Sequence, residues 1–153
     1  MPTLFDKTQR SKQVERLKKL QPDTKAAWGR LNAENLLPHL SDPILVGLGE
    51  YRVPDTDQKF FKTSLGRWLA IFVIPKWPKA PPTAAEFDIT RRGRKGTDFE
   101  KDKKDLFEII ERFGNAKEPE EVPPHPVFGK MSWKAWGHLM DKHIEHHCRQ
   151  FGL

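Results

Sequence analysis

The sequence contains only one cysteine, Cys148, among its 153 residues. A single thiol cannot form a disulfide within the chain, and this fits a reducing compartment. Long hydrophobic runs are also missing, because the strongest one, from Trp68 to Ile74, is far too short to cross a bilayer. The first residues, Met1 to Lys12, are polar and charged and lack the apolar centre of a secretory signal peptide. We therefore expect a soluble cytoplasmic protein with no membrane segment.

Neither sign of charge dominates the chain, since 27 basic residues face 21 acidic ones and the formal net charge is +6. The basic residues gather between positions 12 and 19 and again between 91 and 95. Clusters of this kind can neutralise nucleic-acid phosphates. Here, however, no aromatic residues alternate with the basic ones, as they do on surfaces that stack bases. The first cluster fits the solvated face of a helix and the second fits a glycine-containing loop, so we do not expect nucleic acid as a partner.

The alternation of apolar and polar residues that marks a half-buried strand does not occur over any useful length. Apolar residues recur instead at helical spacing, in segments near 8–20, 32–49, 61–75, 97–113 and 132–151. Asn32, Thr97 and Ser132 are the expected N-caps of three of these helices. Four long helices, with a crossover that carries an extra short helix, predict an all-α four-helix bundle in a single domain over residues 1–153. The short helix, with Phe61 and Phe72 near its ends, is expected to pack on the bundle.

Two histidines interrupt the apolar face of the last predicted helix. Residues four apart on a helix lie about 40° from each other around its axis, so one narrow stripe holds five residues: Trp136, Met140, His143, His147 and Gln150. An ordinary amphipathic helix would place Leu or Ile where the two imidazoles stand. A buried imidazole needs a polar partner, and two histidines at this spacing often share a metal ion. The alternative is a pair of core histidines with ordinary hydrogen bonds.

His39 is the natural third ligand, because metal sites in helical bundles are built from side chains that project inward from facing helices. Three imidazoles leave an open coordination position, which is typical of catalytic rather than structural sites. Taken alone, His39 is better explained as a core histidine with ordinary hydrogen bonds. We expect His125 and His138 to be exposed. We expect His146 on a solvated flank, with a place among the ligands or a hydrogen bond to one of them as alternatives.

Three further residues near this stripe have two interpretations each. Gln150 can orient a ligand or substrate, or it can simply secure the end of the helix. Asp42, one turn after His39, can accept an imidazole N–H or can be a solvated acid. Cys148 points away from the stripe, and nothing in the sequence indicates a depressed thiol pKa, so we do not interpret it as a nucleophile.

The chain resembles the DinB-like superfamily, which includes bacillithiol transferases and mycothiol-dependent isomerases, and it resembles most closely a branch with no assigned function. The resemblance covers nearly the whole chain and is strongest from Trp136 to Phe151. The motifs that carry it are WGRLN at 28–32, LPHL at 37–40, PKWPK at 75–79, HPVFG at 125–129, KHIEHH at 142–147 and QFG at 150–152.

The resemblance implies a four-helix bundle that binds a divalent metal through one histidine of the second helix and two of the last. Transferred residue by residue, these ligands are His39, His143 and His147. Imidazole ligands do not by themselves choose between Zn, Ni and Fe. Related sulfoxide synthases carry an acid two residues after the second histidine of the pair; Arg149 occupies that position here, which argues against their chemistry.

These observations favour a metal-dependent enzyme, a transferase or hydrolase, that activates a thiol or water at the open position and acts on a small-molecule substrate. A low-molecular-weight thiol is a possible second cofactor. The first alternative is a non-catalytic bundle in which the metal mainly stabilises the fold, and the second, suggested by charge alone, is a nucleic-acid-binding protein. We also expect a homodimer, with the apolar helix near 61–72 as its contact surface.

Overall fold

The computed structural model describes residues 1–54, 59–79, 85, 87–88 and 91–153. Four long helices dominate it: α1 (Lys7–Lys18), α2 (Ala33–Gly47), α5 (Phe99–Asn115) and α6 (Trp133–Gln150). Between α2 and α5 come the short helices α3 (Lys59–Lys62) and α4 (Ser64–Trp68) and the π-helix η1 (Leu69–Val73). The described residues contain no strand, only an isolated bridge between His125 and Gly129. The prediction of an all-α bundle is confirmed.

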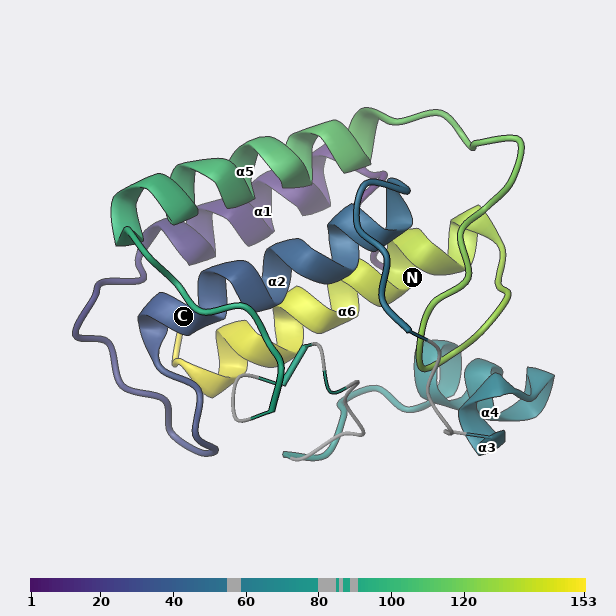
Figure 1. Cartoon of the computed structure of the whole chain (residues 1–153), viewed down its shortest axis with the longest axis horizontal. Helices are drawn as coiled ribbons and strands as arrows, with labels where there is room; N and C mark the ends of the chain where they lie inside the picture. Colours follow the sequence, from purple (N-terminus) through teal and green to yellow (C-terminus); the bar gives the residue numbers. More distant parts are fainter. Residues whose placement is uncertain (55–58, 80–84, 86, 89–90) are drawn as a thin grey trace.

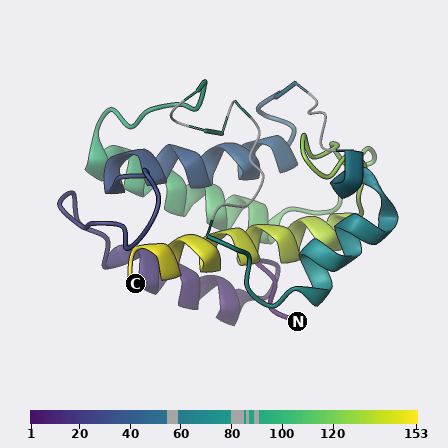
Figure 2. The same ribbon diagram turned by 90° about the horizontal axis from the view of Figure 1, so that it is seen from below.

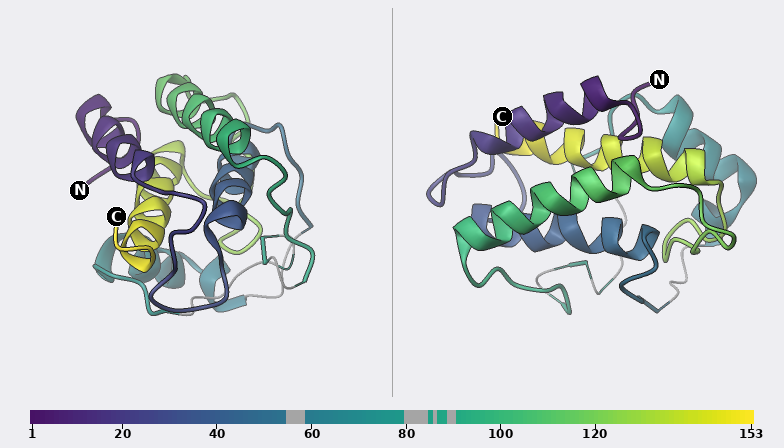
Figure 3. Two further views of the ribbon diagram at one scale, coloured as in Figure 1. Left: turned by 90° about the vertical axis from the view of Figure 1, so that its left-hand side faces the viewer. Right: turned by 90° about the horizontal axis from the view of Figure 1, so that it is seen from above.

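The four long helices form a four-cornered bundle, seen end-on in Figure 3. Both α1 and α2 pack against both α5 and α6. Helices α2 and α5 run in the same direction (Figure 1), because the long crossover returns the chain to the end where α2 began. Figure 2 shows the crossover helices beside the first half of α6, where η1 makes its contacts with the bundle.

Capping side chains explain where the long helices begin. The side chain of Asn32 accepts the backbone N–H of Asn35, and that of Ser132 accepts the N–H of Ala135, as predicted. The predicted cap at Thr97 is wrong by one residue: Asp98 caps α5, because its carboxylate accepts the backbone N–H of Lys101 at 3.0 Å.

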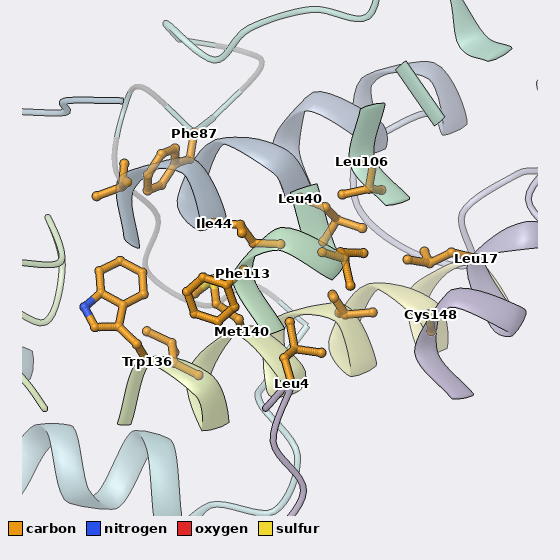
Figure 4. Close-up of a cluster of buried hydrophobic side chains, with 14 of the residues drawn as sticks. Leu4, Leu17, Leu40, Ile44, Phe87, Leu106, Phe113, Trp136, Met140 and Cys148 are labelled. Carbon is orange, nitrogen blue, oxygen red and sulfur yellow. The ribbon is translucent and has the colours of Figure 1, made fainter. Parts of the chain in front are cut away.

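The hydrophobic core fills the space between the four long helices (Figure 4). Every long helix contributes apolar side chains that are almost completely buried, and these lie on the faces predicted from helical spacing: Leu17, Leu36, Leu40, Ile44, Leu106, Ile110, Phe113, Trp136, Met140 and Ile144. Each such side chain contributes about 1.5–3 kcal/mol of transfer free energy on burial. Burial of these side chains therefore helps to hold α2 and α6 side by side.

The prediction that the apolar crossover helix packs on the bundle is wrong for most of its large side chains. Leu65, Trp68 and Phe72 are 60%, 52% and 39% exposed. Ala70 and Ile71 face inward instead, and their carbonyl oxygens accept hydrogen bonds from the Lys142 ammonium group at 2.9 and 2.8 Å. The segment breaks into α3, α4 and a π-turn, so one continuous apolar stripe never forms. Within the described residues, no helix is long and apolar enough to span a membrane.

Candidate metal centre

Three histidine rings from α2 and α6 meet at one point. The Nε2 atom of His39 lies 2.9 Å from that of His147 and 3.1 Å from that of His143, and the last two lie 3.1 Å apart. The structure thus brings together the three residues that the sequence singled out. His147 is buried, whereas His39 and His143 are partly exposed. The three rings are nonetheless largely enclosed, since burial is the main cause that lowers the pKa of each of them.

His39 is held by a backbone carbonyl from the crossover. Its Nδ1 atom lies 2.7 Å from the carbonyl oxygen of Phe87, which can only accept a hydrogen bond. The proton of the neutral His39 ring must therefore be on Nδ1, and Nε2 carries a lone pair directed at the other two rings. Metal-binding histidines use their second nitrogen in this way.

His147 is held by the side chain of Gln150, one turn further along α6. The Gln150 amide nitrogen donates to the carbonyl oxygen of Trp28 at 2.7 Å, and this fixes which end of the amide is oxygen. The Gln150 oxygen then accepts the Nδ1–H of His147 at 2.7 Å. The Nε2 atom of His147 is again left with a lone pair that points into the cluster.

The lone pairs on Nε2 of His39 and Nε2 of His147 thus face each other at 2.9 Å. The neutral His143 ring can donate at most one N–H to this pair of acceptors. A cation at the centre would turn this repulsion into attraction. A proton does not serve at neutral pH, because burial lowers the pKa of all three rings and, for His143 and His147, the neighbouring histidines lower it further. The arrangement is suited to a metal ion.

The size of the triangle fits a transition metal. Three imidazole nitrogens held about 2.1 Å from one ion lie about 3.0 Å apart when their bonds are at right angles, and about 3.4 Å apart in a tetrahedron. The observed spacings of 2.9–3.1 Å fall at the short end of this range. Within the described residues, no fourth His, Cys, Asp or Glu ligand atom joins the three. The three rings can hold an ion and leave a coordination position that no described protein ligand fills.

Trp77, a residue that the sequence reasoning did not single out, forms a wall beside the cluster. Its ring centre lies 6.2 Å from that of His143 and 6.0 Å from that of His146. Its indole N–H donates to the carbonyl oxygen of Ala70 at 2.8 Å, so the π-helix anchors the ring. π-Helical turns often occur at functional sites. Trp77 lies in the PKWPK motif, so the family resemblance already contained a signal for it.

The predictions for the other three histidines are wrong, because all of them are buried. His125 packs on Trp136, and its Nδ1 atom accepts the backbone N–H of Val127 at 3.1 Å, so it secures its own turn. His138 donates from Nδ1 to the carbonyl oxygen of Pro2 at 2.7 Å, which ties down the start of the chain. His146 packs edge-on against His147 with ring centres 5.0 Å apart.

The outcomes for Asp42, Gln150 and Cys148 differ. Neither interpretation of Asp42 is correct: the carboxylate is buried and accepts from the Arg94 guanidinium at 2.6 Å. Both interpretations of Gln150 hold, because it orients His147 and also secures the end of α6. Cys148 is buried in the core, and burial raises the pKa of its thiol to about 12, so it stays an inert thiol.

Fold and site together define a class: an all-α bundle protein with a three-histidine cluster able to hold a metal ion. A family model described as "Protein of unknown function (DUF1569)" matches residues 5–152, and the chain belongs to this family. No curated protein matches the chain, and no solved structure matches it either.

Proposed function

We propose that this protein is a divalent-metal-dependent enzyme of the DinB-like superfamily, a transferase or hydrolase that acts on a small-molecule substrate. The proposed ligands are His39, His143 and His147, and the ion is Zn, Ni or Fe. The observation that carries the proposal is the convergence of three Nε2 atoms, two of them committed to lone pairs by hydrogen bonds on the far side of their rings. In a cluster of ordinary core histidines, a ring proton would be expected between two facing nitrogens, not two lone pairs.

The protein's own contribution would be to fix and partly enclose the site. The Phe87 carbonyl and Gln150 hold two of the rings in one tautomer and one orientation. Trp77 shields one side, and the three described ligand atoms leave a coordination position for substrate. A bound divalent ion would supply Lewis-acid activation, which lowers the pKa of a thiol or a water at the open position. A low-molecular-weight thiol is therefore the co-substrate we propose to test first.

The test compares His143→Ala with His138→Gln in protein loaded with Zn, Ni or Fe(II). His138 lies on the same helix and outside the cluster, and glutamine preserves a donor for the Pro2 carbonyl, so it is a matched control. The readouts are thiol transfer to 1-chloro-2,4-dinitrobenzene and hydrolysis of 4-nitrophenyl acetate. In whichever of the two assays the wild type is active, we expect His143→Ala to lower the rate by about tenfold or more relative to the wild type. We expect His138→Gln to keep the wild-type rate. Equal rates in all three proteins would remove the cluster from the chemistry.

The non-catalytic alternative makes a different prediction. If the ion only stabilises the fold, a chelator lowers the melting temperature and no activity is lost with it. The three-ligand cluster favours the catalytic interpretation, because structural sites are closed by four protein ligands.

We also propose that the protein forms a homodimer through the exposed apolar face of the crossover. Phe60, Leu65, Trp68 and Phe72 are each between 39% and 60% exposed on this face. Aromatic side chains are enriched in the centres of protein interfaces, and contact with a second copy would bury all four. Light scattering should give the mass of two chains for the wild type and of one chain for Leu65→Glu. A wild-type monomer at micromolar concentration would contradict this proposal.

A further inference from the structure

Among the described residues, two buried side-chain atoms lack any hydrogen-bond partner: Nε1 of Trp28 and Nδ1 of His146. An unpaired buried polar group costs about 1–3 kcal/mol, so such groups are rare and need an explanation. These two belong to rings that meet edge-on, with centres 6.2 Å apart. His146 is only 3% exposed and packs directly against the His147 ring. Both unpaired atoms therefore lie on the rings beside the three-histidine cluster.

The groups around these two atoms have a consistent chemistry. Trp28 can only donate a hydrogen bond through its indole nitrogen, so it requires an acceptor. The ammonium group of Lys79 lies 5.5 Å from the centre of the Trp28 ring, and the Arg149 guanidinium acts electrostatically on His146. Trp77 offers only its ring on this side, because Ala70 already takes its N–H. A small ligand with a negatively charged hydrogen-bond acceptor and a short carbon chain matches all of these features.

We propose that Trp28, His146, Trp77 and Lys79 form a carboxylate-binding subsite next to the three-histidine cluster. The two oxygens of a small organic acid would accept from Trp28 Nε1–H and His146 Nδ1–H. Lys79 would balance the charge, and the carbon chain would lie against Trp77. The other end of the molecule would reach the fourth coordination position of an ion held by the cluster. This inference rests on the proposed function and adds the substrate class to it.

The contacts of Trp28 explain how the subsite is tied to the metal centre. The backbone carbonyl of Trp28 accepts from Gln150, which orients His147, while the backbone N–H of Ala27 donates to the carbonyl of Gln150 at 2.8 Å. The loop that presents the indole N–H is thus fixed to the same turn of α6 as one of the proposed ligands. A substrate held by Trp28 would be placed at a fixed distance from the cluster.

The test uses protein loaded with Co(II), a spectroscopic probe, and two thiols of the same shape. 3-Mercaptopropionate carries a carboxylate, and 3-mercaptopropionamide carries a neutral amide in its place. Binding is followed by the thiolate-to-metal charge-transfer absorbance. We expect the wild type to bind the carboxylate about tenfold more tightly than the amide, which corresponds to about 1.4 kcal/mol.

Variants then separate charge from hydrogen bonding. Lys79→Gln, a change at an exposed position that leaves the fold intact, should reduce the preference for the carboxylate. Trp28→Phe keeps an aromatic ring but removes the N–H, so it should weaken binding of both thiols by about threefold to tenfold. Trp133→Phe, which changes an indole in the core, is the matched control. It should alter neither the preference for the carboxylate nor the affinity for either thiol. Co(II) affinity should stay at the wild-type value in all three.

The possible failures are distinguishable. A wild type that binds neither Co(II) nor thiol contradicts the proposed function itself. If Co(II) and both thiols bind equally well and Trp28→Phe and Lys79→Gln change nothing, only the subsite is overturned. The two unpaired atoms would then be hydrated by water alone.

Discussion

At the residue scale, the candidate site depends on a short relay of hydrogen bonds. The Trp28 carbonyl fixes the Gln150 amide, and Gln150 in turn fixes the tautomer of His147. The Phe87 carbonyl does the same for His39. These partners decide which ring nitrogens are available to an ion, so they matter as much as the spacing of the histidines themselves.

We predict that Gln150→Leu lowers metal affinity by about 10–100-fold, because His147 loses the acceptor that orients it. Gln150→Glu is the matched comparison: its carboxylate still accepts the Nδ1–H of His147, although it no longer donates to Trp28. We expect this variant to keep metal affinity and to lose thermal stability. Competition with a chromophoric chelator measures the affinities. Unchanged affinity in Gln150→Leu would show that the relay does not control the cluster.

The metal-free protein should become less stable as the pH falls below about 6.5. Burial lowers the pKa of His125 to about 3 and that of His146 to about 4, and it also lowers those of His39, His143 and His147. Below about 6.5 the unfolded chain therefore binds more protons than the folded one. Each histidine then removes up to about 1.4 kcal/mol of stability per pH unit, down to its folded pKa.

The opposing groups are fewer. Burial raises the pKa of Asp42 and Asp141, which favours the folded state as the pH falls, but these are two carboxyls against five imidazoles. Urea denaturation at pH 7.5, 6.5 and 5.5 measures the free energy of unfolding and so its slope with pH. His125→Gln should reduce it by the contribution of one histidine. Stability that stays constant or rises towards pH 5.5 would contradict this account.

At the element scale, the loop before α2 reaches the site through Gly29. This residue has φ of +80°, which favours glycine, and a Cβ atom there would lie 2.8 Å from the Gln150 amide nitrogen. The close approach is what allows the Trp28 carbonyl to meet Gln150. The loop and the last turn of α6 therefore act as one unit.

Gly29→Ala should consequently lower both stability and metal affinity, because the methyl group displaces Gln150. The backbone strain alone costs about 1–2 kcal/mol. Gly152→Ala is the matched control: Gly152 also has positive φ, at +68°, but nothing lies within 4 Å of its Cβ position. We expect the control to show the strain and to keep wild-type metal affinity. Thermal denaturation and metal titration of both variants measure the two effects, and equal metal affinity in them would contradict the role of Gly29.

Helical periodicity predicted the long elements well, because each long helix buries a stripe of apolar residues against the same core. Asn32 and Ser132 were predictable as caps from residue type and position. The crossover was not, since its apolar residues are spaced as in a helix that buries them, yet Leu65 and Trp68 are exposed. Periodicity reports which residues share a face and does not report what covers it.

At the scale of the whole molecule, the meeting of α2 and α6 could be anticipated, but the surroundings of the site could not. Spacing placed His143 and His147 on one face, the inward projection of side chains from facing helices suggested His39, and the family resemblance supported all three. His125 packs on Trp136 across a proline-containing turn, and His138 is tied to Pro2 at the other end of the chain. No local pattern contains that information.

Polar residues inside the bundle were equally invisible from the sequence. Arg10 is 2% exposed and donates to the carbonyl oxygen of Leu4 at 2.8 Å and to the side chain of Asn115 at 2.9 Å. Gln13 is completely buried and donates to Asp141 at 3.0 Å. Side chains of these two types are mostly exposed in proteins, so residue type alone does not predict their burial. Their partners on α5, α6 and the N-terminal segment exist only once the bundle has formed.

The most direct test of the central claim is the metal content of protein purified without a nickel column. Elemental analysis should give about one divalent transition-metal ion per chain for the wild type and for His138→Gln, and almost none for His143→Ala. Wild-type protein that binds no ion, even after incubation with Zn, Ni and Fe(II), would contradict the claim that the three histidines form a metal centre. So would a His143→Ala protein that retains the full amount.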